Sequence, residues 1–209
     1  MRELFEDADG VRIGQAAYQA DFGERFWRIG PEGFWKLERM QSYDEGDFPS
    51  WLAFRRGEWD ESLRLIEESR PEYAEYYGKI AEAGFRHRRV RIVERPLDPY
   101  VQWELNILHV KNGYGEDVAV LDAERVAPYE TDGPLPELCV LGDEAVYIVE
   151  YTPEGVPDGA LVFTRPDVVA KARAFVRELY AAGEELGSYF PREIAHLEPP
   201  RAAAAEGRP

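Results

Sequence analysis

The segment GFRHRRVRIVERP, residues 84–96, constrains the fold of this chain more than any other stretch. It holds five arginines against a single glutamate, in a chain of 209 residues whose formal net charge is −16. Its valines and isoleucine predict a strand, and strand alternation places Arg89 and Arg91 on one face with Val93. Because charged side chains in such a strand need partners, the segment predicts either internal ion pairs or a binding site for an anion.

Arg89 and Arg91 are ligand-binding candidates because a guanidinium group binds phosphate and carboxylate groups bidentately. The chain also has 41 acidic residues, and those close in sequence, such as Glu94, Asp98 and Glu104, can pair with the same arginines. We therefore interpret internal pairing as the first role of the arginines and ligand binding as the second.

Tyr100, Trp103 and Glu104 follow the arginine-rich strand and are candidates for lining a pocket beside it. The Asp-Pro pair at 98–99 is typical of a helix start, and in that helix Glu104 lies one turn after Tyr100 on the same face. The alternative is that both aromatic residues belong to the core and that Glu104 pairs with an arginine. The end of this helix, residues 105–110, also has the composition of a strand, and both interpretations stay open.

The order of the remaining patterns predicts an α/β fold, with α+β as the alternative. Helices are expected over residues 50–70, divided at Gly57, and then over 71–84, 98–110 and 164–183. Strands are expected over residues 34–40, 85–94, 118–122, 137–142, 145–152 and 159–164. These elements predict a mixed sheet of about five or six strands flanked by helices in a single domain.

Composition divides the chain into three parts. Residues 1–48 are irregular in pattern but rich in Trp and Phe, which predicts a segment packed onto the core. Residues 49–197 form the expected α/β domain, and residues 198–209 indicate a flexible tail.

The bulk properties exclude several classes of protein. A surface this acidic repels phosphate groups, so direct binding of nucleic acid is not expected. No apolar run approaches the roughly 18 residues of a membrane span, and the acidic start lacks a secretory signal. Cys139 is the single cysteine, so an internal disulfide is excluded and a cytoplasmic location is expected.

Cofactor signatures are missing from the sequence. The three histidines, His87, His109 and His196, lie far apart and lack the spacing of a zinc site. Neither a dinucleotide-binding glycine motif nor a P-loop occurs. We therefore expect no metal and no cofactor.

Three stretches together resemble a known family: FWKLERMQSY, VRIVERPLDPYVQWEL and FVRELYAAGEEL, at residues 34–43, 90–105 and 175–186. The family is an uncharacterised domain of unknown function, common in high-GC Gram-positive bacteria and often encoded beside helix-turn-helix regulators. The resemblance implies a role in regulation. It implies no established activity and no catalytic residues.

The stretch HVKNGYGED, residues 109–117, is similar to part of the phospholipase D signature, in which His-x-Lys is followed by Asp. His109 and Lys111 fit, whereas Glu116 stands at the Asp position and the Gly-Ser and Asn portion is absent. In that family the His is the nucleophile and the Lys binds phosphate, so this resemblance implies His109 and Lys111 as catalytic candidates.

Two hypotheses follow for function. The first is a non-catalytic regulatory or interaction protein that binds a basic protein partner, such as a helix-turn-helix transcription regulator, through its acidic surface. The alternative is a phospholipase D-like enzyme or another small-anion-binding domain that uses the arginine-rich strand. Its candidate residues are Arg89, Arg91, Tyr100, Trp103 and Glu104 for ligand binding, with His109 and Lys111 for catalysis.

Overall fold

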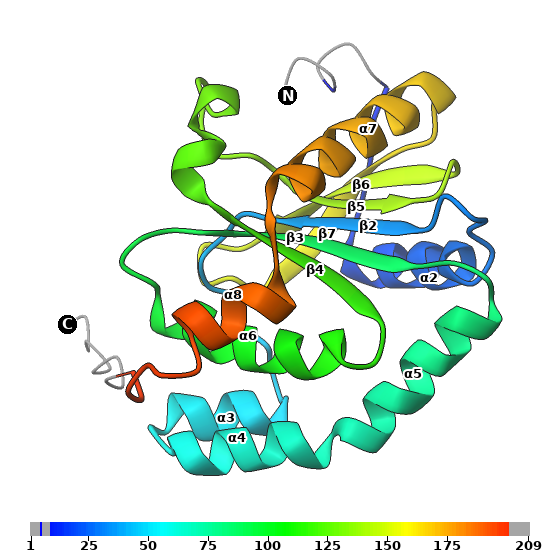
Figure 1. Cartoon of the computed structure of the whole chain (residues 1–209). Coiled ribbons are helices and arrows are strands. Elements are labelled where there is room, and N and C mark those ends of the chain that lie inside the picture. The colour runs from blue at the N-terminus through cyan, green and yellow to red at the C-terminus, as the bar shows by residue number, and fades with distance from the viewer. Residues whose placement is uncertain (1–4, 6–8, 201–209) are drawn as a thin grey trace.

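The computed structural model describes residue 5 and residues 9–200 of the chain, which form one mixed sheet with helices on both faces (Figure 1). The strands described are β1 (Val11–Ile13), β2 (Phe34–Glu38), β3 (His87–Val93), β4 (Glu116–Asp122), β5 (Glu137–Leu141), β6 (Ala145–Tyr151), β7 (Pro157–Phe163) and β8 (Glu184–Glu185). The helices described are α2 (Gln15–Phe26), α3 (Pro49–Arg55), α4 (Trp59–Glu68), α5 (Arg70–Glu82), α6 (Pro99–Asn112), α7 (Pro166–Ala182) and α8 (Leu186–Glu193).

The sheet has the strand order β1-β7-β6-β5-β2-β3-β4-β8. The neighbours β2, β3 and β4 are parallel, and every other pair is antiparallel. Helix α6 connects β3 to β4, which is the crossover that parallel neighbours require. The predicted α/β class and mixed sheet are therefore confirmed.

All six predicted strands are present, and the sheet gains two short ones that the sequence did not reveal. β1 has three residues and β8 has two, which is too few for an alternating pattern to show. Residues 1–48 are also more regular than expected, because they contain β1, α2 and β2. Tyr18, Phe22 and Phe26 recur every four residues along α2, and this helical spacing was the signal available in the sequence.

Helix α6 settles the ambiguity at residues 105–110 in favour of a helix, which continues to Asn112. Asp98 begins it as expected, since its carboxylate accepts a hydrogen bond of 2.7 Å from the backbone N–H of Tyr100. The apolar residues that resemble a strand are buried because α6 packs between the sheet, α8 and α4. Burial on several sides, rather than strand alternation, explains their composition.

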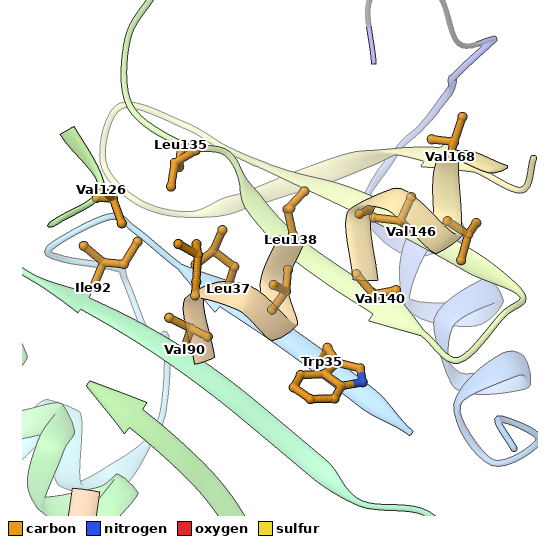
Figure 2. Close-up of a cluster of buried hydrophobic side chains, with 14 of the residues drawn as sticks. Trp35, Leu37, Val90, Ile92, Val126, Leu135, Leu138, Val140, Val146 and Val168 are labelled. Carbon is orange, nitrogen blue, oxygen red and sulfur yellow. The ribbon is translucent and has the colours of Figure 1, made fainter. Parts of the chain in front are cut away.

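One face of the sheet is covered by α7 (Figure 1) and is apolar. Figure 2 shows side chains from β2, β3 and β5 meeting there, including Leu37, Val90 and Leu138, each fully buried. We call this group the α7 core. Along each central strand, side chains that point into this core alternate with side chains that point to the opposite face of the sheet.

The opposite face carries α6, α8 and α2, with α3 and α4 as an outer layer against α6 (Figure 1). Two apolar clusters lie on this face, one around α6 and one around α2. Polar residues of β2 and β3 lie between the two clusters, and these residues hold the candidate site.

The last described residues are tied to helix α6. Residues 201–209, most of the predicted flexible tail, lie outside the described residues, and the carbonyl of Glu198 accepts a hydrogen bond of 2.9 Å from the Gln102 side chain. No helix within residues 9–200 is long and apolar enough to cross a membrane.

Candidate functional site

Arg89 and Arg91 lie on the α6 side of β3, as strand alternation predicts. Arg89 donates to Glu116 on β4 at 2.6 Å and to Glu38 on β2 at 2.5 Å. Arg91 is fully buried and donates to Glu104 on α6 at 2.6 Å. The expected pairing of Arg91 with Glu104 is thus present, and both arginines tie neighbouring elements together through the interior.

These ion pairs explain why an acidic chain places arginines in a central strand. The Glu116 carboxylate also accepts a hydrogen bond from the Tyr77 hydroxyl, and Nδ1 of His87 lies 3.2 Å from its Oε1, so its charge has several neighbours. Burial alone would raise the pKa of Glu116, but Arg89 outweighs burial and holds that pKa well below its usual range. A buried carboxylate at this position therefore stays ionised.

A cavity of about 250 Å³ lies beside these pairs, between α6, α5 and the polar residues of β2 and β3. We call it the α6 cavity. Its charged lining residues are Lys36, Glu38, Glu45, Arg89, Glu104 and Lys111. Its aromatic and apolar lining residues are Phe48, Tyr73, Tyr100, Trp103, Ile107 and Leu108. The lining is thus about equally charged and apolar, so the cavity offers both polar groups and apolar surface to a small molecule.

Helix α6 supplies one wall of this cavity. Tyr100, Trp103 and Glu104 lie along a single stripe of the helix, so the three candidates predicted there come together. Trp103 is buried, and its indole N–H donates to the hydroxyls of Ser50 and Ser62 at 3.0 Å each. These bonds fix the ring of Trp103 against the α3–α4 pair.

The loop after β2 supplies the mouth of the cavity with Glu45 and Phe48. Buried Glu137 on β5 anchors this loop, since its carboxylate accepts hydrogen bonds from the Tyr43 hydroxyl at 2.6 Å and from the Met40 N–H at 2.7 Å. The Tyr100 hydroxyl donates to the carboxylate of exposed Glu45. This hydrogen bond connects the loop at the mouth of the cavity to helix α6 where the cavity opens to solvent.

On the floor, Glu38 is held by two cations. Its carboxylate pairs with Arg89 and with Lys36. Burial alone would raise the pKa of Glu38, but Arg89 and then Lys36 keep that pKa below its usual range. Burial likewise opposes the charge of Lys36, yet the Glu38 carboxylate raises the pKa of Lys36 above its usual value. Glu38 and Lys36 therefore both carry charge inside the protein.

Lys111, which is partly exposed, differs from the other cations of the cavity lining. Among the described residues its ammonium forms no ion pair or hydrogen bond, and it lies 5.4 Å from the centre of the Tyr73 ring. Burial lowers the pKa of Lys111. The Glu116 carboxylate acts against this change, whereas the nearby charges of Arg89 and Lys36 lower the pKa further. The cavity therefore contains a cation that forms no ion pair with the described residues, although the charge of Glu116 acts on it from further away.

Glu104 is the carboxylate in the cavity that titrates near neutral pH. Burial raises the pKa of Glu104 to about 7, although Arg91 acts against the rise. The charge of the cavity consequently changes between pH 6 and pH 8.

His109 and Lys111, the catalytic candidates of the phospholipase D resemblance, lie on α6 two residues apart. Residues with this spacing project to different sides of a helix. The His109 ring is stacked on Phe190 of α8, with ring centres 4.0 Å apart, whereas Lys111 lines the cavity. The structure does not bring the two side chains together.

Sequence reasoning singled out some of these residues and missed others. Lys36 and Glu38 alternate with Trp35 along β2, so their shared face could be predicted from the pattern. Tyr73 and Glu45 gave no such signal, because tertiary contacts alone bring their segments to the cavity. Within residues 9–200 no group of three or more His, Cys, Asp or Glu is placed to hold a metal ion.

Comparison with known proteins identifies a family without a known activity. Residues 20–191 match the family described as a domain of unknown function, DUF6879, and the chain belongs to it. No curated protein matches the sequence.

Among solved structures, the chain is similar to TrmBL2, described as an archaeal chromatin protein with a novel mode of DNA binding. The two share 12% sequence identity with a TM-score of 0.43, over 87% of this chain and 54% of that one. This chain therefore spans about half the length of that protein, and the match is too distant to bear on function.

Proposed function

We propose that this protein is a binding domain for a small organic anion, which the α6 cavity holds by its charged group. The observation that carries the proposal is Lys111, a cation that lines the cavity without an ion pair among the described residues. A charge that is partly removed from water and forms no ion pair is costly, and a bound carboxylate would reduce that cost. The proposal assigns binding and no chemical step.

The other walls support an organic anion over an inorganic one. Phe48, Trp103 and Ile107 offer aromatic and aliphatic surface to the same space. A ligand with a ring or aliphatic body would replace water there, which contributes binding free energy in proportion to the area buried. Glu45 at the edge of the cavity accepts a hydrogen bond from Tyr100. The charges of Lys36, Glu38, Arg89 and Glu104 are balanced by internal ion pairs, so a single anionic group is the best match for Lys111.

Thermal unfolding with a panel of small aromatic and aliphatic carboxylates tests this proposal. A ligand at 100 times its Kd stabilises the native state by about 2.7 kcal/mol, which raises Tm by roughly 5–10 °C in a chain of this size. The Lys111→Met variant should lose this response. Lys79→Met is the matched control, because Lys79 lies on the exterior of α5 and pairs with Glu75. The absence of any response in the wild type would count against the proposal.

A second candidate function is regulation through a basic protein partner, such as a helix-turn-helix transcription regulator. The observation that favours it is the distribution of charge: the chain carries −16 overall, while Lys36, Arg89 and Arg91 lie inside among their own partners. The outer surface therefore keeps its acidic excess. Recovery of such a partner at low ionic strength, and its loss at high salt, would support this function.

A further inference from the structure

Two polar atoms at the α6 cavity have no hydrogen-bond partner among the described residues: the second carboxylate oxygen of Glu38, Oε2, and the hydroxyl oxygen of Tyr73. Glu38 is only 3% exposed, and both residues line the cavity. Ser69 lies near the Tyr73 hydroxyl, but the pair lacks the geometry of a hydrogen bond. Buried polar atoms are normally paired, so these two atoms point to polar groups supplied from outside the chain.

The charge around Glu38 indicates what kind of group can meet its free oxygen. The other oxygen, Oε1, is shared by Arg89 at 2.5 Å and Lys36, and these cations keep the carboxylate ionised. Oε2 therefore accepts hydrogen bonds and cannot donate one. A second positive group would be repelled by the two cations already present, so a neutral donor such as a hydroxyl is favoured over an ammonium.

The unpaired groups thus differ in what they require. The Lys111 ammonium needs an anion, the Tyr73 hydroxyl can donate to the same anion, and Glu38 Oε2 needs a donor. A ligand that satisfies all three carries a carboxylate and a separate hydroxyl.

We propose that the ligand of the α6 cavity is a hydroxy acid with an aromatic or aliphatic body. Its carboxylate binds Lys111 and Tyr73, its hydroxyl donates to Glu38, and its body packs against the apolar wall of the cavity. This inference rests on the proposed function, because it names the chemical class of the anion that the cavity binds.

Three acids with one carbon skeleton test it by isothermal titration calorimetry on the full chain. 3-Phenyllactate has a hydroxyl beside its carboxylate, phenylalanine has an ammonium there, and 3-phenylpropanoate has neither. 3-Phenyllactate should bind at least tenfold more tightly than 3-phenylpropanoate, the factor expected for a hydrogen bond to a charged acceptor. Phenylalanine should bind more weakly than either of the other two acids.

The results separate this inference from the proposed function. Equal affinity for 3-phenyllactate and 3-phenylpropanoate, or tightest binding of phenylalanine, would overturn the hydroxy-acid inference and leave an anion site in place. If none of the three binds while other carboxylates raise Tm, the inference is again wrong and the proposed function stands. If no carboxylate has any effect, both fail.

Two variants assign the contacts. Tyr73→Phe should weaken both 3-phenyllactate and 3-phenylpropanoate several-fold without loss of stability, since the hydroxyl makes no hydrogen bond in the described residues. Tyr76→Phe, at an exposed position of the same helix, is the control. Glu38→Gln should reduce the preference for 3-phenyllactate over 3-phenylpropanoate. If that variant does not fold, the ranking with the wild type decides the question by itself.

Discussion

The two faces of the central sheet are built from alternate residues of the same strands, yet they are opposite in character. On the α7 side, Leu37 and Val90 pack into a core of apolar side chains. On the α6 side, Glu38 and Arg89 form ion pairs beside a cavity with unpartnered polar atoms. Buried charge and empty volume cost stability, so the contrast agrees with the proposal that one face stabilises the fold and the other binds a ligand.

Replacement of Arg89 should lower the free energy of unfolding more than any other change considered on the α6 face. Arg89→Met would leave Glu38 and Glu116 without their shared cation, and we expect a loss of about 4 kcal/mol in the free energy of unfolding. Urea denaturation measures this loss. Arg88→Met is the control, because Arg88 lies on the opposite face over the Trp35 ring and should cost about 1 kcal/mol or less. Equal losses in the two variants would contradict the role of Arg89.

A cavity made in the α7 core should lower stability without reaching the binding site. Leu37→Ala removes a fully buried side chain, and we expect a cost of about 3 kcal/mol in the free energy of unfolding. The affinity for a small carboxylate should be unchanged at temperatures where the variant is folded. A large change in affinity would show that the two faces are not separate in function.

Replacement of Lys111 should have the opposite effect on stability. Lys111→Met exchanges a partly desolvated cation, which has no ion pair among the described residues, for an apolar side chain, and we expect a gain of about 1 kcal/mol in the unliganded protein. Lys79→Met on the exterior should give no gain. A clear loss of stability in Lys111→Met would mean that the cation is already compensated within the protein.

The smallest expected effect is a dependence of anion affinity on pH. With its pKa near 7, Glu104 is mostly neutral at pH 6 and mostly ionised at pH 8, where it repels an anion in the same cavity. Affinity should therefore rise as pH falls, by roughly fivefold between pH 8 and pH 6 in calorimetric titrations. In Glu104→Gln, which keeps an acceptor for Arg91, the profile should be flat over this range.

The Glu104 carboxyl group also makes the stability of the fold depend on pH. The pKa of Glu104 in the folded chain lies above the ordinary value of 4.5, so the folded state binds its proton more tightly than the unfolded state. The stability contributed by this proton is fully present below about pH 4.5 and is lost as pH rises through about 7. Glu104→Gln should remove this part of the pH dependence of unfolding.

Much of the fold could be predicted from local pattern. Alternation placed Arg89 and Arg91 on one face of a strand, the Asp98–Pro99 pair marked the start of α6, and all six longer strands were found. Pairing of these arginines with acids nearby in sequence was expected, and Glu104 does pair with Arg91. The partners of Arg89, Glu38 and Glu116, were not foreseen. The missed elements β1 and β8 are short strands that depend on neighbours distant in sequence for their hydrogen bonds.

The site could be predicted only in part. Tyr100, Trp103 and Glu104 were expected beside the arginines because helical spacing aligns them. Lys111 was singled out through a resemblance that paired it with His109, whereas the structure places Lys111 on the cavity and His109 against Phe190. Tyr73 had no local signal for the cavity, since its place depends on how α5 packs against α6.

The sequence by itself determined the class of the fold and the two-sided character of its central strands, because both depend on periodicities of neighbouring residues. Tertiary structure alone decided which charges pair and which remain without partners. Glu38, Glu116 and Arg89 come from three different strands. Only after those strands and α6 have come together is Lys111 without an ion pair among the described residues. Partners distant in sequence meet through packing of the whole domain, and this is why the candidate site became visible only in the folded chain.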